Sequence, residues 1–149
     1  MVLKARVIMT IEIRFGTQHL NWPALCELIR LAPLGERDPE KMQRAAENSY
    51  VVCSAYVNNE LVGFGRAISD GQYQAAIYDI VVLPQYQGKG VGRLIMQSIL
   101  EKLPEGSLSL LYVVPGKQKF YEKFGFGNLT TGMGRFPDPE KAHRNGYLV

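Results

Sequence analysis

An apolar run meets a glycine-rich turn in the segment Ile80-Val81-Val82-Leu83-Pro84-Gln85-Tyr86-Gln87-Gly88-Lys89-Gly90-Val91-Gly92-Arg93. Glycine permits positive φ angles and lets another group approach the bare backbone. The following residues, 91–103, repeat their apolar positions at helical spacing, so the turn leads into a helix N-terminus. Several N–H groups there lack intrahelical partners, and the helix dipole adds partial positive charge. The segment therefore predicts a cradle for a phosphate or pyrophosphate, with Lys89 and Arg93 adding cationic charge.

Two common phosphate-binding loops do not match this segment. A Walker A loop requires Ser or Thr directly after its Gly-Lys pair, whereas Lys89 is followed by Gly90, and the earlier glycine of that motif is also absent. A dinucleotide-binding fingerprint that starts at Gly88 would require a third glycine where Arg93 stands. The cradle is therefore of another type.

Hydrophobic periodicity and capping residues predict the elements on either side of this segment. The expected elements, in order, are a strand at 6–15, helices from Asn21 and from Asp38 to about Asn48, strands at 50–57, 61–69 and 75–83 in an antiparallel meander, a helix at 91–103, a strand at 108–114, and short helices at 117–124 and from Asp138. The run at 108–114 is nearly all apolar, which is typical of a strand covered on both faces. Strand, helix and strand in this order indicate a parallel crossover. The fold class is therefore α+β around one central mixed sheet.

Length and composition favour a single domain over residues 1–149, since roughly 100–150 residues is the commonest domain size. The net charge of +3 suits an anionic ligand but is too small to indicate a nucleic-acid partner. No apolar run approaches the roughly 20 residues that span a bilayer, and the N-terminus lacks a signal-peptide pattern, so we expect a cytoplasmic protein without membrane association. Cys26 and Cys53 show no metal or disulfide spacing and are expected to be small buried hydrophobes.

Two spaced motifs resemble those of one protein family. Gln87-Gly88-Lys89-Gly90-Val91-Gly92 matches the pattern Gln/Arg-x-x-Gly-x-Gly/Ala, and Phe120-Tyr121-Glu122-Lys123-Phe124-Gly125-Phe126 matches Phe-Tyr-x-x-x-Gly-Phe after the next strand. Both are similar to signatures of the GNAT family, the GCN5-related N-acetyltransferases, and the resemblance extends over residues 7–126. It implies a central mixed sheet of six to seven strands with a splayed parallel pair, flanked by about four helices. It also implies an acyltransferase that moves an acetyl group from acetyl-CoA to a primary amine.

The resemblance assigns the cofactor contacts residue by residue. The backbone of Ile80, Val81 and Val82 would hydrogen-bond the pantetheine arm as an added strand would. The loop and the helix start would hold the pyrophosphate, through Gln87, Gly88, Lys89, Gly90, Val91, Gly92 and Arg93. The same valines also suit an apolar core, and the two roles are compatible because the proposed contacts involve backbone atoms.

Tyr121 and Asp79 are the catalytic candidates. A tyrosine hydroxyl is protonated at neutral pH, so Tyr121 is able to protonate the departing coenzyme A sulfur. An ordinary packing role on its helix is the alternative. Asp79 would accept the proton of the amine, directly or through water, or would instead pair with a cation on the outer face of the sheet; Glu27 and Glu12 are weaker alternatives. A backbone N–H near Val82 would meet the tetrahedral oxyanion.

The acceptor is less well defined by the sequence. Acidic residues at Glu27, Glu36, Asp38 and Glu40 suit a cationic amine, and solvated helix ends explain them equally well. A small-molecule amine is favoured over a protein N-terminus or lysine because no charged track for protein docking is present.

His19 and His143 have no partner pattern, and no metal-ligand spacing occurs, so no metal is expected. A CoA-binding regulatory module and a non-catalytic interaction domain are the alternatives, and a homodimer through the C-terminal strands is compatible with the pattern.

Overall fold

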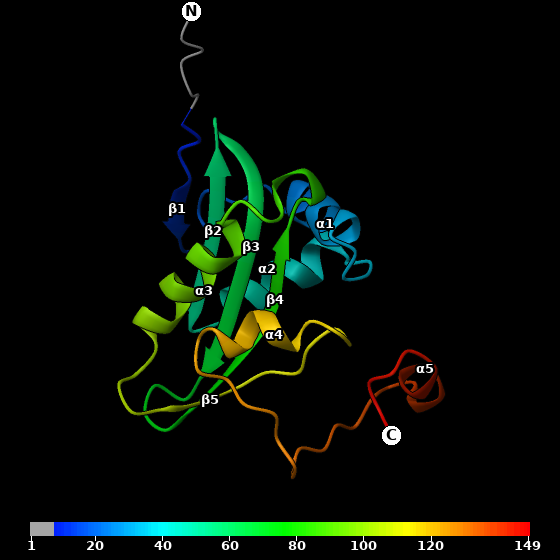
Figure 1. Cartoon of the computed structure of the whole chain (residues 1–149). Helices are drawn as coiled ribbons and strands as arrows, with labels where there is room; N and C mark the ends of the chain where they lie inside the picture. The colour runs from blue at the N-terminus through cyan, green and yellow to red at the C-terminus, as the bar shows by residue number, and fades with distance from the viewer. Residues whose placement is uncertain (1–7) are drawn as a thin grey trace, which may run out of the picture. The chain divides into compact units, whose positions relative to one another are not determined.

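The computed structural model describes residues 8–149, which fall into two units that meet in sequence between Leu110 and Leu111. The first unit holds the sheet and three α-helices (Figure 1). Its elements are β1 (Glu12–Phe15), α1 (Trp22–Leu31), α2 (Pro39–Glu47), β2 (Val51–Val57), β3 (Glu60–Ser69), β4 (Gln74–Val82), the 3-10 turn η1 (Pro84–Tyr86), α3 (Val91–Lys102) and β5 (Leu108–Leu110). The prediction of a single domain over the whole chain stays a prediction.

The sheet is mixed and its strands lie in sequence order, β1-β2-β3-β4-β5. β1 to β4 pair antiparallel, and β4 pairs with β5 in parallel, which confirms the predicted α+β class, meander and crossover. The described residues form five strands and five α-helices, where six to seven strands and about four helices were expected.

The first strand is shorter than predicted for a reason found in its partner. β1 pairs with β2 from Glu12, opposite Tyr56, to Phe15, opposite Cys53. β2 ends at Val57, and the turn residues Asn58 and Asn59 have positive φ angles of 49° and 63°. Only Val57 of β2 lies beyond Tyr56, so the pairing could continue by at most one residue before Glu12. The start of the predicted strand, residues 6 and 7, lies outside the described residues.

The prediction of a long, doubly covered strand at 108–114 is wrong. β5 has three residues, paired as Gln74↔Leu108, Ala75↔Ser109 and Ala76↔Leu110, and both leucines are exposed. β5 is an edge strand whose ladder ends at Ala76. An apolar run alone does not specify how far a neighbouring strand pairs with it.

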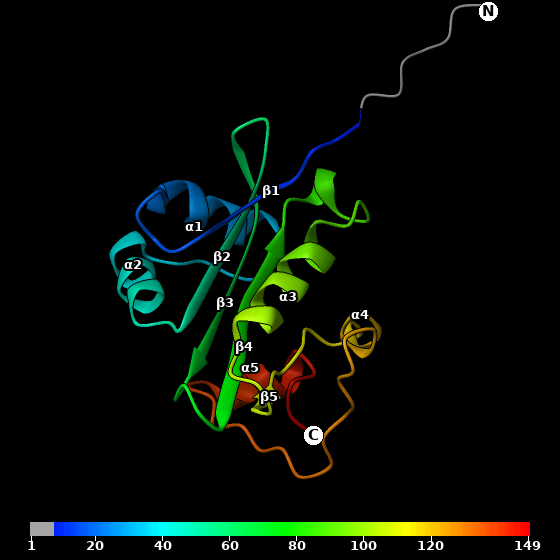
Figure 2. The ribbon, with the colours of Figure 1, turned by 90° about the vertical axis from the view of Figure 1, so that its left-hand side faces the viewer.

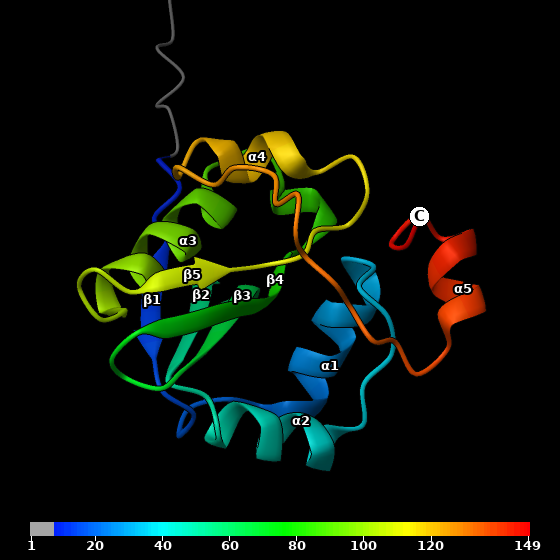
Figure 3. The same ribbon diagram turned by 90° about the horizontal axis from the view of Figure 1, so that it is seen from below.

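Helices cover both faces of the sheet in the first unit. α1 and α2 lie on one face and α3 on the other (Figure 2). The view from below shows the same helices on the same two faces (Figure 3). α3 buries Val91, Ile95, Met96 and Ile99, and α1 buries Leu25, Leu28 and Ile29. The predicted starts of α1 and α2 are confirmed, because Asn21 Oδ1 accepts from the Ala24 N–H and Asp38 Oδ1 from the Lys41 N–H, each at 2.9 Å.

β4 contains one residue more than β3 at a β-bulge. Phe64 pairs with Val81 and Arg66 with Tyr78, so Gly65 alone faces both Asp79 and Ile80. Asp79 adopts a left-handed backbone conformation, with φ of 57°. The bulge therefore reorients the strand at the residue proposed from the sequence as the base.

Gly65→Ala is expected to destabilise the fold by about 1–3 kcal/mol, because core overpacking has that cost. A Cβ at this position would lie 2.5 Å from Ile80 Cδ1 and 2.9 Å from atoms of Ile95 and Ile99. Urea unfolding measures the effect. Gly127→Ala is the control, since its added Cβ would meet nothing within 4 Å. Equal stability of the two variants would contradict tight packing beside the bulge.

The second unit contains two short helices, α4 (Gln118–Glu122) and α5 (Pro139–Arg144). Both were predicted. Asp138 Oδ1 caps α5 by accepting from the Lys141 N–H at 2.9 Å, and Gly125 and Gly146 follow the two helices with φ angles of 87° and 80°. Tyr112, Phe136 and Tyr147 form an aromatic cluster in this unit, with ring centroids 5.9–6.0 Å apart.

Candidate functional site

β4 has an edge without a strand partner next to the glycine loop. β3 pairs with β4 as far as Val82, whereas β5 pairs with it only as far as Ala76. Within the described part of the chain, residues 77–82 therefore have no strand on the β5 side. This is the splayed parallel pair that was predicted. Ile80, Val81 and Val82 belong to this stretch of backbone.

The glycine loop has the backbone conformation that its sequence predicts. Gly88 and Gly90 have φ angles of 73° and 88°, and a Cβ added to either would meet nothing within 4 Å. Gly90 is the N-cap of α3, and no side chain caps this helix. The helix begins with the Leu94 N–H donating to the Gly90 carbonyl at 3.1 Å. The N–H groups of Val91, Gly92 and Arg93 precede that bond, so they have no intrahelical acceptor.

Charges and side chains around the loop are consistent with an anion site. Lys89 and Arg93 are exposed, and Lys89 Nζ lies 5.6 Å from the centre of the Tyr86 ring. The Val91 side chain is buried in the core, which leaves only its backbone for ligand contact. Gln87 ties the loop to the strand, because its Nε2 donates to the Val82 carbonyl at 3.1 Å. Gln87 thus has a structural contact in addition to its predicted place in the cradle.

Asp79 is part of a mostly buried ion cluster. Its side chain is 7% exposed; Oδ2 accepts from Arg66 Nε at 2.7 Å, and Oδ1 accepts from Arg37 Nη2 at 3.4 Å. Arg66 also donates from Nη1 to Ser49 Oγ at 3.3 Å. The cation pairing considered from the sequence is therefore present, although the carboxylate lies inside the protein and not on an outer face. Neither pairing could be predicted from the sequence, since Arg66 and Arg37 lie 13 and 42 residues from Asp79.

Tyr121 lies on α4 in the second unit. Its ring packs edge-on against Phe120 and Phe126, at centroid distances of 4.9 and 6.3 Å. Burial raises the pKa of Tyr121 above its ordinary value of 10.0. The hydroxyl therefore keeps its proton at neutral pH, as a general acid requires. The packing contacts of the alternative interpretation are present as well.

Three of the four acidic residues considered for acceptor binding have local roles, and they are Glu27, Asp38 and Glu40. Glu27 pairs with Arg30 at 2.6 Å, Glu40 with Arg44 at 3.9 Å, and Asp38 caps α2. Glu12 pairs with Arg14 at 2.8 Å on the edge strand. Asp38 and Glu40 lie at the start of α2, as the helix-end explanation predicts, whereas Glu27 pairs within α1. The Asp79 cluster is the more distinctive charged group.

The remaining candidate residues behave as ordinary structural groups. Both cysteines are free thiols; Cys53 is buried, and burial raises its pKa to about 12. Ser54 Oγ donates to the Arg14 carbonyl at 3.2 Å and therefore accepts from His19 Nε2 at 2.8 Å, which confirms His19 as a satisfied histidine. The residues that the structure describes contain no cluster of three His, Cys, Asp or Glu side chains able to hold a metal.

His19 is expected to make the fold less stable at acid pH. Burial, followed by the Arg14 charge, lowers the pKa of His19 below 6.5. Folding therefore favours the neutral ring; its contribution is complete above pH 6.5 and is lost as the pH falls through the lowered pKa. Melting temperatures measured between about pH 8 and pH 5 should fall less for His19→Gln than for the wild type. The same fall in both proteins would contradict this role.

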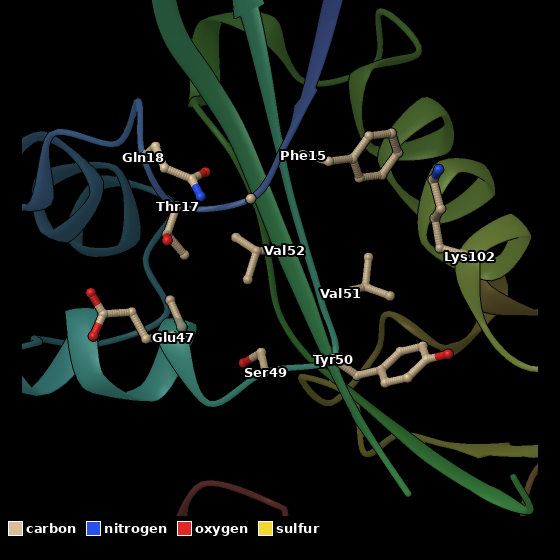
Figure 4. Close-up of a pocket in the computed structure, with 11 residues that line it drawn as sticks. Phe15, Thr17, Gln18, Glu47, Ser49, Tyr50, Val51, Val52 and Lys102 are labelled. Atoms are coloured by element: carbon tan, nitrogen blue, oxygen red, sulfur yellow. The ribbon is translucent and has the colours of Figure 1, made fainter. Parts of the chain in front are cut away.

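A cavity of about 500 Å³ lies in the first unit, apart from the predicted site residues. Figure 4 shows its walls, which come from the end of β1, the end of α2 and the start of β2, with Lys102 at the end of α3. None of the predicted site residues lines it. Lys102 Nζ lies 4.8 Å from the centre of the Phe15 ring, and Glu47 accepts from Gln43 at 2.8 Å. The charged groups of this cavity are thus engaged with neighbouring side chains.

Helices in the described residues are all too short or too polar to cross a membrane.

Comparison with known proteins identifies the family. The model of the acetyltransferase (GNAT) family matches residues 20–126. An uncharacterized N-acetyltransferase of Pyropia yezoensis, ycf52, is 34% identical over 117 residues, covering 74% of this chain and 67% of that protein. The chloroplastic serotonin N-acetyltransferase 2 of rice is 32% identical, covering 76% of this chain and 60% of its own length. The structure of a GNAT-family acetyltransferase, SP0256 of Streptococcus pneumoniae, matches with a TM-score of 0.74 and 26% identity, over 85% of this chain and 98% of that one. The chain belongs to the GNAT family of acetyltransferases and is an acyltransferase enzyme.

Proposed function

We propose that this enzyme transfers the acetyl group of acetyl-CoA to a primary amine of a small molecule. The observation that carries the proposal is the open edge of β4, which leads directly into an uncapped helix N-terminus through Gly88 and Gly90. An extended pantetheine arm is able to hydrogen-bond a free strand edge, as in strand addition. A pyrophosphate suits unpaired N–H groups at a helix start.

The proposed contacts follow this geometry. The backbone of Ile80, Val81 and Val82 holds the pantetheine. The N–H groups from Gly88 to Arg93 hold the pyrophosphate, and the exposed Lys89 and Arg93 add positive charge. Open space around Gly88 and Gly90 supports this arrangement, because a ligand is able to approach the backbone there.

The proposed reaction is direct attack of the neutral amine on the thioester carbonyl. The N–C bond forms, the C–S bond breaks, and Tyr121 donates its proton to the departing sulfur. Asp79 accepts the proton of the amine, directly or through water. A backbone N–H near Val82 stabilises the oxyanion. Tyr121 is protonated at neutral pH, as a proton donor must be.

Two relatives favour different acceptors. The rice relative is named for serotonin, a small amine, and a soybean relative with 30% identity is named a histone acetyltransferase. We favour the small amine, because the sequence contains no charged track for docking a protein. A cytoplasmic location stays a prediction, since the rice relative is chloroplastic by name.

A two-stage experiment tests this function. Calorimetric titration of the purified protein with acetyl-CoA and free CoA is expected to show micromolar binding. Thiol release is then followed with serotonin, other primary amines and a lysine-containing histone peptide. Release with small amines supports the proposal, and release only with the peptide replaces the acceptor class. Binding without release would indicate a regulatory CoA-binding module, and absence of binding would refute the proposed function.

A further inference from the structure

Two arginines contact the Asp79 carboxylate, and their contacts are unequal. Arg66 binds Oδ2 at 2.7 Å, comes from the neighbouring strand β3, and is 15% exposed. Arg37 binds Oδ1 at 3.4 Å, comes from the connection between α1 and α2, and is 37% exposed. Arg66 is therefore the permanent partner of Asp79, and its position is fixed by the sheet. Arg37 is held loosely and is open to solvent.

The charges of this cluster do not balance. Two guanidinium groups surround one carboxylate, so the cluster carries one positive charge in excess. Asp79 needs only one cation to be paired, and Arg66 already supplies it along with the shorter contact. The second contact is weak, since partly exposed ion pairs contribute little. Arg37 is therefore a cation that another cation is able to replace at small cost.

We propose that Arg37 occupies, in the free enzyme, the position on Asp79 Oδ1 that the ammonium group of the acceptor takes during the reaction. The inference rests on the proposed function, because it assumes that an amine meets Asp79. The acceptor class that follows is a primary amine that is cationic at neutral pH. Displacement of Arg37 by this ammonium leaves the charge of the cluster unchanged.

The exchange also explains how the product leaves. The ammonium gives one proton to water, and its neutral nitrogen then attacks the thioester. The nitrogen gives its second proton to Asp79 as the C–S bond breaks and Tyr121 protonates the sulfur. The resulting amide carries no charge and does not compete for the carboxylate. After Asp79 has released its proton to solvent, Arg37 returns to Oδ1. Arg37 thus favours substrate over product at the same oxygen.

Removal of the Arg37 charge tests the proposal. Arg37→Gln is expected to lower KM for the best cationic amine about two- to fivefold, since a partly exposed ion pair is weak. KM for acetyl-CoA should not change. Arg37→Lys keeps the competing charge and should stay near the wild type. Calorimetric titration of the CoA-saturated protein with the same amine should show the same gain in affinity without any chemistry.

Arg30→Gln is the matched control, because it removes the same charge from neighbouring α1, where Arg30 pairs with Glu27 at 2.6 Å on the exposed surface. It should leave KM for the amine unchanged. A higher KM in Arg37→Gln would show that Arg37 binds the acceptor, and an unchanged KM would show that it does not compete; either result overturns the inference. If the wild type acetylates no amine, the proposed function fails first. Melting curves verify that both variants are folded.

Discussion

Gly90→Asp is expected to weaken acetyl-CoA binding about 100-fold or more. Position 90 is the N-cap of α3, and the space around it is open. A carboxylate there would face the pyrophosphate, and like charges brought together cost several kcal/mol, where each 1.4 kcal/mol is tenfold in affinity. Calorimetric titration with acetyl-CoA and with free CoA measures the loss.

Gly106→Asp provides a matched control for this variant. Gly106 has a φ angle of 74°, close to the 88° of Gly90, and its added Cβ also meets nothing within 4 Å. Both variants therefore carry a similar backbone cost of about 1–2 kcal/mol, but only one carries a charge in the cradle. Normal binding by Gly106→Asp, together with lost binding by Gly90→Asp, would assign the effect to the ligand site. Equal binding by both variants would rule out the cradle as the pyrophosphate site.

Tyr121→Phe is expected to lower kcat about 100-fold or more, with little change in the dissociation constant of acetyl-CoA. The variant keeps the ring that packs against Phe120 and Phe126 and removes only the hydroxyl. General acid catalysis typically contributes about 10²- to 10⁴-fold. Steady-state kinetics with a saturating amine, combined with calorimetry, separates turnover from binding.

Tyr147→Phe is the control in the same unit. Tyr147 is also half-buried in an aromatic cluster, with its ring 5.9 Å from Tyr112 and 6.0 Å from Phe136. It should retain wild-type kcat. If Tyr121→Phe also retains wild-type kcat, Tyr121 has only its packing role, and water or another group protonates the sulfur.

Features that depend on residues close together in the sequence were predicted correctly. Asn21, Asp38 and Asp138 cap the helices that they were expected to begin. Gly88 and Gly90 adopt the positive φ angles for which glycine was expected. A capping contact joins residues three positions apart, and a φ angle belongs to one residue. Such features are readable from a short stretch of chain.

Features that depend on strand register were not predicted. β1 and β5 are shorter than expected because their partners turn away or cease to pair, and the β-bulge opposite Gly65 has no sequence mark of its own. The bulge puts Asp79 in its left-handed conformation. The end of a strand and the position of a β-bulge depend on how two strands pair with each other, so neither can be read from one strand's sequence.

The amino-acid sequence alone was sufficient to identify the glycine-rich turn, the helix that follows it and the family, because these rest on local backbone preferences and closely spaced motifs. The charge environment of Asp79 came only from the folded chain. Arg66 and Arg37 lie 13 and 42 residues from Asp79, and only the pairing of β3 with β4 and the path of the α1–α2 connection bring them to its two oxygens. Ion pairs act through space, so their partners depend on tertiary packing and not on sequence neighbourhood.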